Sequence, residues 1–305
     1  MTSRRPALGQ ARQLPVPIPP AMNETIESYL RRLAVINHIS YETLTVHLGL
    51  TPDRRGPRIR PDNLARLVTI TGYSREHLTR ALPQLANRHT DSSLLADWPR
   101  PACPACTNRH RGGRVTRYYP SYVHACPKHR LWVSGGEFQR AHRRDVLDIS
   151  GTPAVLAAHS KHRRLAQRRG PQPTQYAFTV ARAFWNNLAS IPTHSGVTER
   201  LGILKPVTRP VIALDDLEYL AASYPNVVNI AALLASPHWR RIASRNETRK
   251  LFLTELGWRT SGERRPYWPR HNSDPIAQWI DRLTHAGIDW TKLRPPLHFY
   301  APQIL

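Results

Sequence analysis

Apolar residues in the first third of the chain recur at the three- and four-residue spacing of an amphipathic helix. This spacing predicts a first helix over residues 24–34, with Asn23 as its N-cap. A second helix is expected to begin after Ser40 and to stop at Gly49, because serine caps helix starts and glycine favours helix ends. The buried stripes would consist of Ile26, Tyr29, Leu30 and Leu33 in the first helix, and Leu44 and Leu48 in the second.

The next two apolar stripes predict a helix-turn-helix. Pro61 suits the first position of a third helix, and Gly72-Tyr-Ser74 predicts a turn in which Ser74 caps a fourth helix. The fourth helix would present its polar side chains outward, where a DNA reader places its contacts to bases and phosphates. An ordinary helical hairpin with a solvated face fits the same pattern. The candidate DNA contacts here are Arg75, His77 and Arg80.

Most of the remaining periodic segments also predict helices, so the fold class is mainly α. Gly170-Pro-Gln-Pro173 predicts a linker, and the basic, proline-rich first twenty residues predict an extended arm rather than core. We expect four regions: the arm at 1–20, a helical and helix-turn-helix domain at 21–97, a zinc-stapled β-hairpin unit with a basic helix at 98–169, and a helical domain at 170–305. The further helices are expected over 155–169, 176–188, 215–222, 227–234, 247–256 and 276–286.

All three cysteines stand in one short window, and a histidine completes a set of four metal ligands. Cys103-Pro-Ala-Cys106 is followed, after nineteen residues, by Cys126-Pro-Lys-His129. Two pairs of ligands, each three positions apart, supply the four donors of a tetrahedral zinc site. Because protein groups fill every position, the expected zinc is structural; a catalytic zinc keeps one position open for water. The alternative is three buried thiols and a surface histidine.

The residues between the two pairs fit a small metal-stapled unit. Gly112-Gly113 allows a hairpin bend, and the segment from Val115 to Tyr119 has β character. His124 is a substitute ligand in this prediction, although it lacks a partner at the right spacing.

The net charge adds a second strong signal, because 44 Lys and Arg face 21 Asp and Glu, giving +23. A field of this sign attracts polyanions, so we expect duplex DNA or a nucleoprotein complex as partner. Arginine-rich genome composition and docking of acidic proteins are alternatives. Residues 140–169 carry eight Lys or Arg against two Asp, and the helix over 155–169 would align a basic stripe able to track phosphates, or merely a solvated face. The candidate contacts are Arg143, Arg144, Lys161, Arg164 and Arg168.

Several chemistries lack their sequence signals. The chain has no G-x-x-x-x-G-K-[ST] phosphate loop and no G-x-S-x-G elbow. The clearest acidic cluster, Asp215-Asp216 with Glu218, falls at a predicted helix start, where acids satisfy the helix dipole. We therefore expect no enzymatic activity. The sequence has no run of about eighteen apolar residues that would predict a membrane span, and no apolar segment that would predict a secretory signal. Because reduced thiolates are typical of the cytoplasm, we expect a cytoplasmic, nucleoid-associated protein.

One segment near the N-terminus resembles a known family. Glu27-Ser-Tyr-Leu-Arg-Arg-Leu-Ala34 is similar to the E-S-x-x-S-W-L-x-R-L-A signature of TniQ/TnsD proteins, with Tyr29 where tryptophan is usual. The C-P-x-C motif with a downstream C-x-x-H resembles the zinc motif of that family. The resemblance covers residues 15–165. It implies target selection in transposition, either on DNA directly or through an RNA-guided complex, and recruitment of an AAA+ ATPase of the TnsC type that activates the transposase.

The resemblance also implies where the ATPase docks. The N-terminal helical region of the family contacts the ATPase, so residues 24–95 are the expected docking surface, with Arg31 and Arg32 as its exposed contacts. We thus predict a DNA-binding adaptor for DNA recombination. A stand-alone helix-turn-helix transcription regulator with a structural zinc, and a nuclease built on a zinc-stapled fold, are the rival hypotheses.

Overall fold

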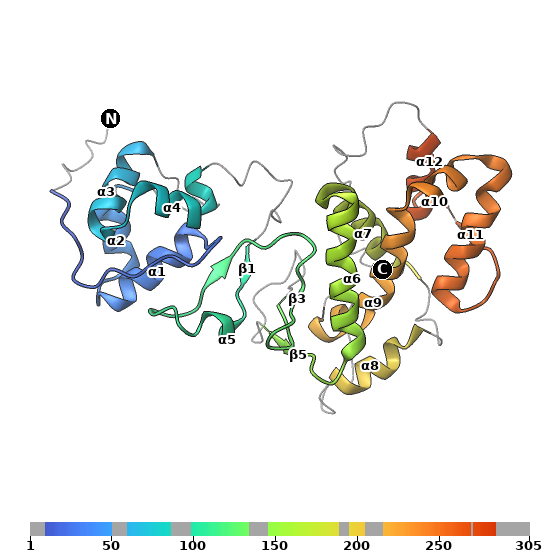
Figure 1. Cartoon of the computed structure of the whole chain (residues 1–305), viewed down its shortest axis with the longest axis horizontal. Coiled ribbons are helices and arrows are strands. Elements are labelled where there is room, and N and C mark those ends of the chain that lie inside the picture. The colour runs from blue at the N-terminus through green and yellow to red at the C-terminus, as the bar shows by residue number, and fades with distance from the viewer. Residues whose placement is uncertain are drawn as a thin grey trace. The chain divides into compact units, whose positions relative to one another are not determined.

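The computed structural model describes residues 10–50, 60–86, 99–133, 146–188, 195–204, 216–269 and 271–284. The chain is mainly helical, as predicted, and forms two compact units, residues 1–119 and 120–305 (Figure 1). None of the described helices is long and apolar enough to cross a membrane.

Helices form most of the first unit, which follows the predicted order. Thr25 rather than Asn23 caps the first helix: its hydroxyl accepts a hydrogen bond from the Ser28 amide, whereas Asn23 has a left-handed φ of 59°. Ser40 caps the second helix, as predicted. The helices are α1 (Ile26–Ile36), α2 (Tyr41–His47), α3 (Pro61–Thr71) and α4 (Arg75–Ala81), followed by the short 3₁₀ helix η1 (Pro83–Ala86).

The predicted helix-turn-helix is present as α3, a turn and α4. Pro61 occupies the first turn of α3, and Gly72 ends that helix at φ 69°, a left-handed conformation that glycine adopts without strain. The Ser74 hydroxyl accepts a hydrogen bond from the His77 amide and so caps α4. α4 has only seven residues, or about two turns.

The described part of the N-terminal arm packs into the core, contrary to the prediction that it lies outside. Its chain is extended, but Ile18 is only 3% exposed and belongs to the apolar cluster of this unit. The Leu14 amide donates to the Ile70 carbonyl at 2.9 Å, and the Tyr29 hydroxyl donates to the Ile18 carbonyl at 3.0 Å. The aliphatic residues that alternate with the prolines supply these buried side chains. A prediction from the basic, proline-rich composition alone does not take them into account.

The described strands are two residues long and form two small antiparallel sheets. In the first unit, β1 (Arg100–Pro101) pairs with β2 (Thr116–Arg117). In the second unit, β4 (Leu131–Trp132) lies between β3 (Ala125–Cys126) and β5 (Leu147–Asp148).

The second unit is helical after β5, and its helices differ from the prediction in three respects. Residues 171–173, predicted as a linker, form the first turn of α7, since proline is well tolerated there. Two predicted helices form one helix, α9, that continues through Pro225, and α8 and α10 were not predicted. The helices are α6 (Pro153–Arg169), α7 (Pro171–Asn186), α8 (Val197–Leu204), α9 (Leu217–Leu234), α10 (Pro237–Ser244), α11 (Asn246–Ser261) and α12 (Pro275–Thr284).

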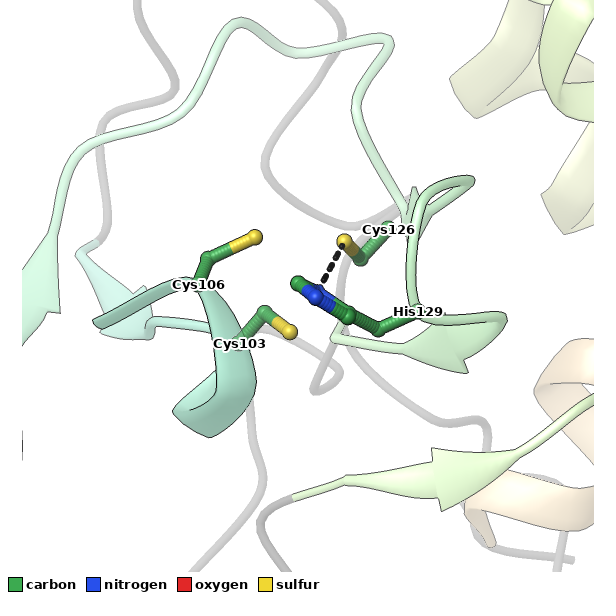
Figure 2. Close-up of side chains that lie close together, drawn as sticks. All are labelled: Cys103, Cys106, Cys126 and His129. Atoms are coloured by element: carbon green, nitrogen blue, oxygen red, sulfur yellow. Dashed lines mark hydrogen bonds between the residues drawn. The ribbon is translucent and has the colours of Figure 1, made fainter. Parts of the chain in front are cut away.

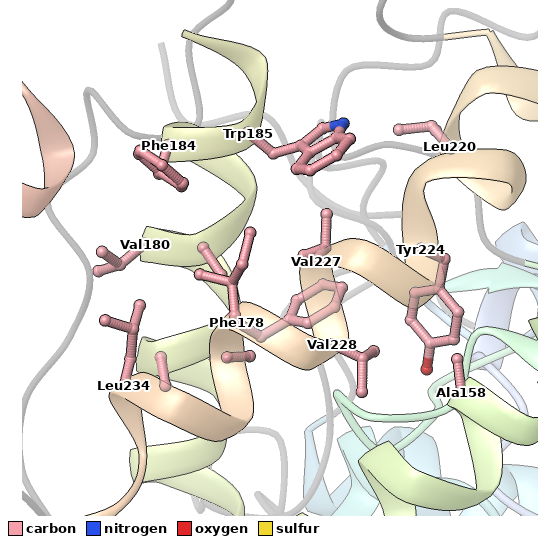
Figure 3. Close-up of a cluster of buried hydrophobic side chains, with 14 of the residues drawn as sticks. Ala158, Phe178, Val180, Phe184, Trp185, Leu220, Tyr224, Val227, Val228 and Leu234 are labelled. Atoms are coloured by element: carbon pink, nitrogen blue, oxygen red, sulfur yellow. The ribbon is translucent and has the colours of Figure 1, made fainter. Parts of the chain in front are cut away.

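The core of the second unit lies where α6, α7 and α9 pack on one another (Figure 1). Phe178 and Trp185 of α7 lie beside side chains of α9 such as Tyr224 and Leu220, as Figure 3 shows. Most of α9 is buried, which is why its sequence is an almost continuous apolar run rather than an amphipathic stripe.

Two buried histidines of α6 border this core. His162 is 1% exposed, and its Nδ1 lies 3.0 Å from the Tyr224 hydroxyl. Burial, followed by the charges of His159 and Arg182, lowers the pKa of His162 to about 3. Burial, followed by the charge of Arg163, lowers the pKa of His159 to about 4. Both imidazoles are therefore neutral at pH 7.

Acid should destabilise the second unit through these histidines. A histidine in the unfolded chain has a pKa near 6.5, so above this pH the imidazole is neutral in both states and does not lower the stability of the folded unit. As the pH falls from 6.5 toward 4, these histidines become protonated in the unfolded chain but stay neutral in the folded unit. The free energy of unfolding therefore falls by about 1.4 kcal/mol per pH unit for each histidine. We expect His159→Leu to lose about 2 kcal/mol less stability than wild type between pH 7 and 4.5 in urea unfolding. The exposed His238→Leu is the control; if it behaves like His159→Leu, the burial argument is wrong.

Candidate metal centre

The first pair of candidate ligands lies on a single helical turn. Cys103 is the N-cap of α5 (Pro104–Thr107), where Pro104 starts the turn and the Thr107 amide donates to the Cys103 carbonyl at 3.1 Å. One turn brings Cys106 back to the side of Cys103. The turn is held by the β1–β2 ladder, since the Ala102 amide donates to the Val115 carbonyl at 2.8 Å.

The second pair lies on the tight connection between β3 and β4. Cys126 is the last residue of β3 and is paired with Leu131, so His129 falls within the turn between them. Arg130 has a left-handed φ of 53°, which lets the chain reverse directly after the histidine. The Ile149 amide, beyond β5, donates to the Arg130 carbonyl at 2.9 Å and fixes the end of this turn.

The four side chains converge, as Figure 2 shows: one ligand atom from each of Cys103, Cys106, Cys126 and His129 lies within 4.8 Å of the others. The Cys126 sulfur is 3.6 Å from Nδ1 of His129. A tetrahedral zinc with Zn–S bonds of about 2.3 Å and Zn–N bonds of about 2.0–2.1 Å requires ligand separations of roughly 3.5–3.8 Å. A small contraction of the cluster therefore suffices to bind a metal, and the predicted ligand set is the one that the fold assembles.

His124, the substitute ligand of the sequence prediction, lies elsewhere. It is buried, and its ring stacks on Phe178 at 5.0 Å and on Trp132 at 5.6 Å between centroids. The ring belongs to the aromatic edge of the core rather than to the four-residue cluster.

The candidate centre is attached to the helical core of the first unit through the start of α1. The Thr25 amide donates to the Thr116 carbonyl, and the Thr116 amide donates to the Ser28 hydroxyl, both at 2.9 Å. The Tyr118 amide donates to the Asn23 carbonyl at 2.8 Å. Residues 23–25 thus add to β2 on the side away from β1, so the hairpin that carries Cys103 is continuous with α1.

A buried ion pair between Glu24 and Arg32 lies beneath this attachment. Both are essentially inaccessible, at 0% and 1% exposure, and Nη2 of Arg32 lies 2.7 Å from Oε2 of Glu24. Nε of Arg32 and the Ser28 hydroxyl both donate to the other carboxylate oxygen at 2.8 Å. Nη1 of Arg32 reaches the Arg111 carbonyl at 2.7 Å, and a Cβ on Gly112 would overlap the Arg32 carbonyl. The glycine therefore lets the hairpin loop approach α1.

This network corrects one prediction. Arg32 was expected to be an exposed partner contact, but it is a buried ion-pair residue, so only Arg31 keeps that role as a candidate. With Tyr29 at the tryptophan position of the family signature, the glutamate, second serine and arginine of that signature fall on Glu24, Ser28 and Arg32. The prediction missed Glu24 because it aligned the glutamate of the signature with Glu27. The signal that could have found it is the four-residue spacing of Glu24, Ser28 and Arg32, since side chains at this spacing lie on one face of a helix.

The candidate DNA contacts of the first unit lie on α4. Arg75 and Arg80 are exposed, whereas His77 is partly buried and stacks on Tyr73 with ring centroids 5.1 Å apart. The arginines remain candidates on grounds of exposure, and His77 has a packing role as well.

In the second unit, α6 carries Lys161, Arg164 and Arg168 on its polar side, and the two arginines are exposed. Nζ of Lys161 donates to Oδ1 of Asn229 at 2.6 Å, and burial, followed by the charges of Arg259 and Arg164, lowers the lysine pKa. The lysine thus helps to join α6 to α9. Arg143 and Arg144 lie outside the described residues.

We expect one zinc per chain, and we expect Cys106→Ser to abolish its binding. Because structural zinc contributes on the order of 10 kcal/mol to local folding, this variant should unfold or aggregate the region around 98–135. The control is Ala105→Ser, which places a serine one residue away and should retain the metal. Elemental analysis of both purified variants and of wild type is the measurement; wild type without stoichiometric metal contradicts the assignment.

Arg32→Ala should destabilise the first unit by about 3–5 kcal/mol, because it leaves the Glu24 carboxylate buried without its ion-pair partner. The control is the neighbouring Arg31→Ala, which removes an exposed pair with Glu27 and should cost less than about 1 kcal/mol. Urea unfolding gives both values. Hydrogen exchange at Thr116 and Tyr118 should accelerate in Arg32→Ala alone. Equal effects of the two substitutions would show that the buried network does not anchor the hairpin.

Comparison with known protein families supports the signature and the metal motif together. Residues 15–132 match the TniQ family model, a range that includes the buried network and all four candidate ligands. No curated protein and no solved structure matches the chain significantly. TniQ domains are associated with target selection in transposition, and residues 15–132 of this chain are similar to such a domain.

Proposed function

We propose that this protein is a target-selection adaptor in transposition, which binds duplex DNA and recruits an AAA+ ATPase of the TnsC type to it. The observation that carries the proposal is the TniQ match over residues 15–132. The adaptor has no catalytic step of its own and acts on chromosomal DNA in the cytoplasm. Further machinery, a transposase or an RNA-guided complex, would join through the ATPase or the adaptor.

The proposed metal is a structural zinc. Cys103, Cys106, Cys126 and His129 supply four protein ligands, so no coordination position would remain for a substrate or an activated water. The metal would hold the hairpin rigid, and the buried Glu24–Arg32 pair would hold the hairpin on α1.

DNA binding is supported by the net charge of +23 and by arginines that point into solvent. Arg75 and Arg80 on α4, and Arg164 and Arg168 on α6, are the proposed phosphate or base contacts. Contacts of this kind release counterions, so the affinity for any duplex should fall steeply with salt.

The proposed ATPase-docking surface is the outer face of α1 and α2. Val35 on α1 and Val46 on α2 are each 61% exposed, so both helices present an apolar side chain to solvent. The Arg31 guanidinium lies 4.3 Å from the centre of the Tyr41 ring and 2.8 Å from the Glu27 carboxylate, so it is held in place beside this face. A preordered arginine beside apolar residues is typical of interface hot spots.

A transcription regulator is the second candidate, and the α3–α4 helix-turn-helix favours it. Such a regulator would bind one duplex sequence and need no ATPase.

Recruitment of the ATPase distinguishes the adaptor hypothesis from the transcription-regulator hypothesis. We expect the protein, bound to immobilised duplex DNA in ATP, to retain the TnsC-type ATPase, and Arg31→Glu to reduce this retention at least tenfold with zinc content unchanged. Arg32→Glu is unsuitable because it would break the buried pair. The control is Arg12→Glu, an equal charge reversal at an exposed site outside α1 and α2. If wild type retains no ATPase under any nucleotide, the regulator hypothesis replaces the adaptor.

A further inference from the structure

Two helices of the second unit, α6 and α11, are joined through one residue of α9. Nζ of Lys161 on α6 donates to Oδ1 of Asn229 at 2.6 Å, and Nη1 of Arg259 on α11 donates to the carbonyl of the same Asn229 at 3.1 Å. Burial, followed by the charges of Arg259 and Arg164, lowers the pKa of Lys161. These contacts place the middle of α6 beside the last turn of α11 on one surface of the second unit.

Trp258 stands next to this junction with about half of its side chain in solvent. It immediately precedes Arg259 and is 48% exposed. Leu251, two turns earlier on the same face of α11, is 60% exposed. Single exposed apolar side chains are ordinary on a protein surface, so exposure alone assigns no role to the tryptophan. Its position matters because the junction beside it leads directly to the basic face of α6.

The side chains on the α6 side of the junction are positively charged. α6 contains five Lys or Arg and neither Asp nor Glu. Arg164 and Arg168 follow Lys161 by three and seven residues, so they share its face of the helix, and both are exposed. On α11, the acid nearest to the indole along the chain is Glu255, which accepts a hydrogen bond from Nε of Arg259 at 2.7 Å. The surface therefore combines exposed guanidinium groups with an exposed indole, and its nearest carboxylate is engaged.

We propose that Arg164, Arg168 and Trp258 form a surface that binds single-stranded nucleic acid. The guanidinium groups would contact phosphates, and an unpaired base would stack on the indole, which is how proteins hold single strands without reading their sequence. A regular duplex cannot use the indole in this way, because its bases are stacked on one another. The inference goes beyond the proposed function, which concerns duplex DNA and the ATPase. It adds a binding role to the second unit, most of which lies outside the TniQ match.

The test compares two tryptophans of similar exposure. Trp258→Ala removes the proposed stacking platform, and Trp268→Ala is the matched control, since Trp268 is 61% exposed. Trp268 lies on the segment after α11, which packs on the other side of that helix. A Cβ on Gly257 would overlap the Arg265 carbonyl of this segment, and Gly257 is about 200° round the helix from Arg259. Binding of fluorescein-labelled oligothymidylate, oligouridylate and a duplex is measured by anisotropy, with zinc content and circular dichroism as folding checks.

Trp258→Ala should weaken the binding of single strands at least about fivefold, because stacking of one base on an aromatic side chain contributes at least this much, and it should change duplex affinity less than about twofold. A strand of abasic sites should bind wild type about as weakly as oligothymidylate binds Trp258→Ala. Arg164→Gln with Arg168→Gln should flatten the plot of log affinity against log salt by about 1.4 for single strands, because each phosphate contact contributes about 0.7. Should Trp258→Ala misfold, Trp258→Leu keeps an apolar side chain without an aromatic face and gives the same comparison.

Equal losses in Trp258→Ala and Trp268→Ala would contradict the proposed surface, as would an abasic strand that binds wild type as tightly as oligothymidylate. If wild type binds duplex DNA but no single strand, the inference is wrong while the proposed function stands. If wild type binds single strands but no duplex, the inference stands and the proposed duplex binding fails. A preference for oligouridylate or for oligothymidylate supports the surface and identifies the strand as RNA or DNA. If Trp258→Ala keeps its affinity for single strands but loses binding to poly-glutamate, the surface recognises acidic protein and the nucleic-acid assignment is overturned.

Discussion

The buried ion pair between Glu24 and Arg32 is the interaction on which the first unit depends. Removing two charges from water costs several kcal/mol for each, and only a complete set of partners offsets that cost. Here the set is complete around the carboxylate, which accepts from Arg32, Ser28 and the Ala21 amide. The guanidinium also donates to the carbonyls of Pro19 and Arg111. One pair of residues therefore fixes three segments, the N-terminal arm, α1 and the hairpin loop, in one arrangement.

That arrangement explains how such small strands persist beside the candidate metal centre. A two-stranded ladder of two-residue strands is not stable alone in water. The β1–β2 hairpin gains further backbone hydrogen bonds from residues 23–25. A bound metal would also cross-link Cys103 and Cys106 to Cys126 and His129. Because Cys103, Cys106 and the Arg111 carbonyl that binds Arg32 all lie on the connection between β1 and β2, a bound metal and the ion pair would stabilise the same hairpin.

The distribution of charge separates structural arginines from those available to a partner. Arg32 and Arg259 form ion pairs with carboxylates within the fold, at 2.7 Å in both cases. Arg75 and Arg80 on α4, and Arg164 and Arg168 on α6, are by contrast exposed. The chain has 44 Lys and Arg against 21 Asp and Glu, a net charge of +23. This excess of positive charge supports the proposal that the partner is a polyanion.

The sequence by itself determined the elements whose signals are local. Helix periodicity and capping residues predicted α1 to α4, and the paired spacing of Cys103, Cys106, Cys126 and His129 predicted the ligand cluster. Only the tertiary structure decided which face of each element is buried: Arg32 and His162 are inaccessible and Arg31 is not, although all are polar residues on predicted helices. In the tertiary structure, two predicted helices form the single helix α9, which continues through Pro225, and Arg100 lies opposite Arg117 in the β1–β2 ladder. These outcomes depend on partners distant in sequence, whereas propensity and spacing report only on neighbours along the chain.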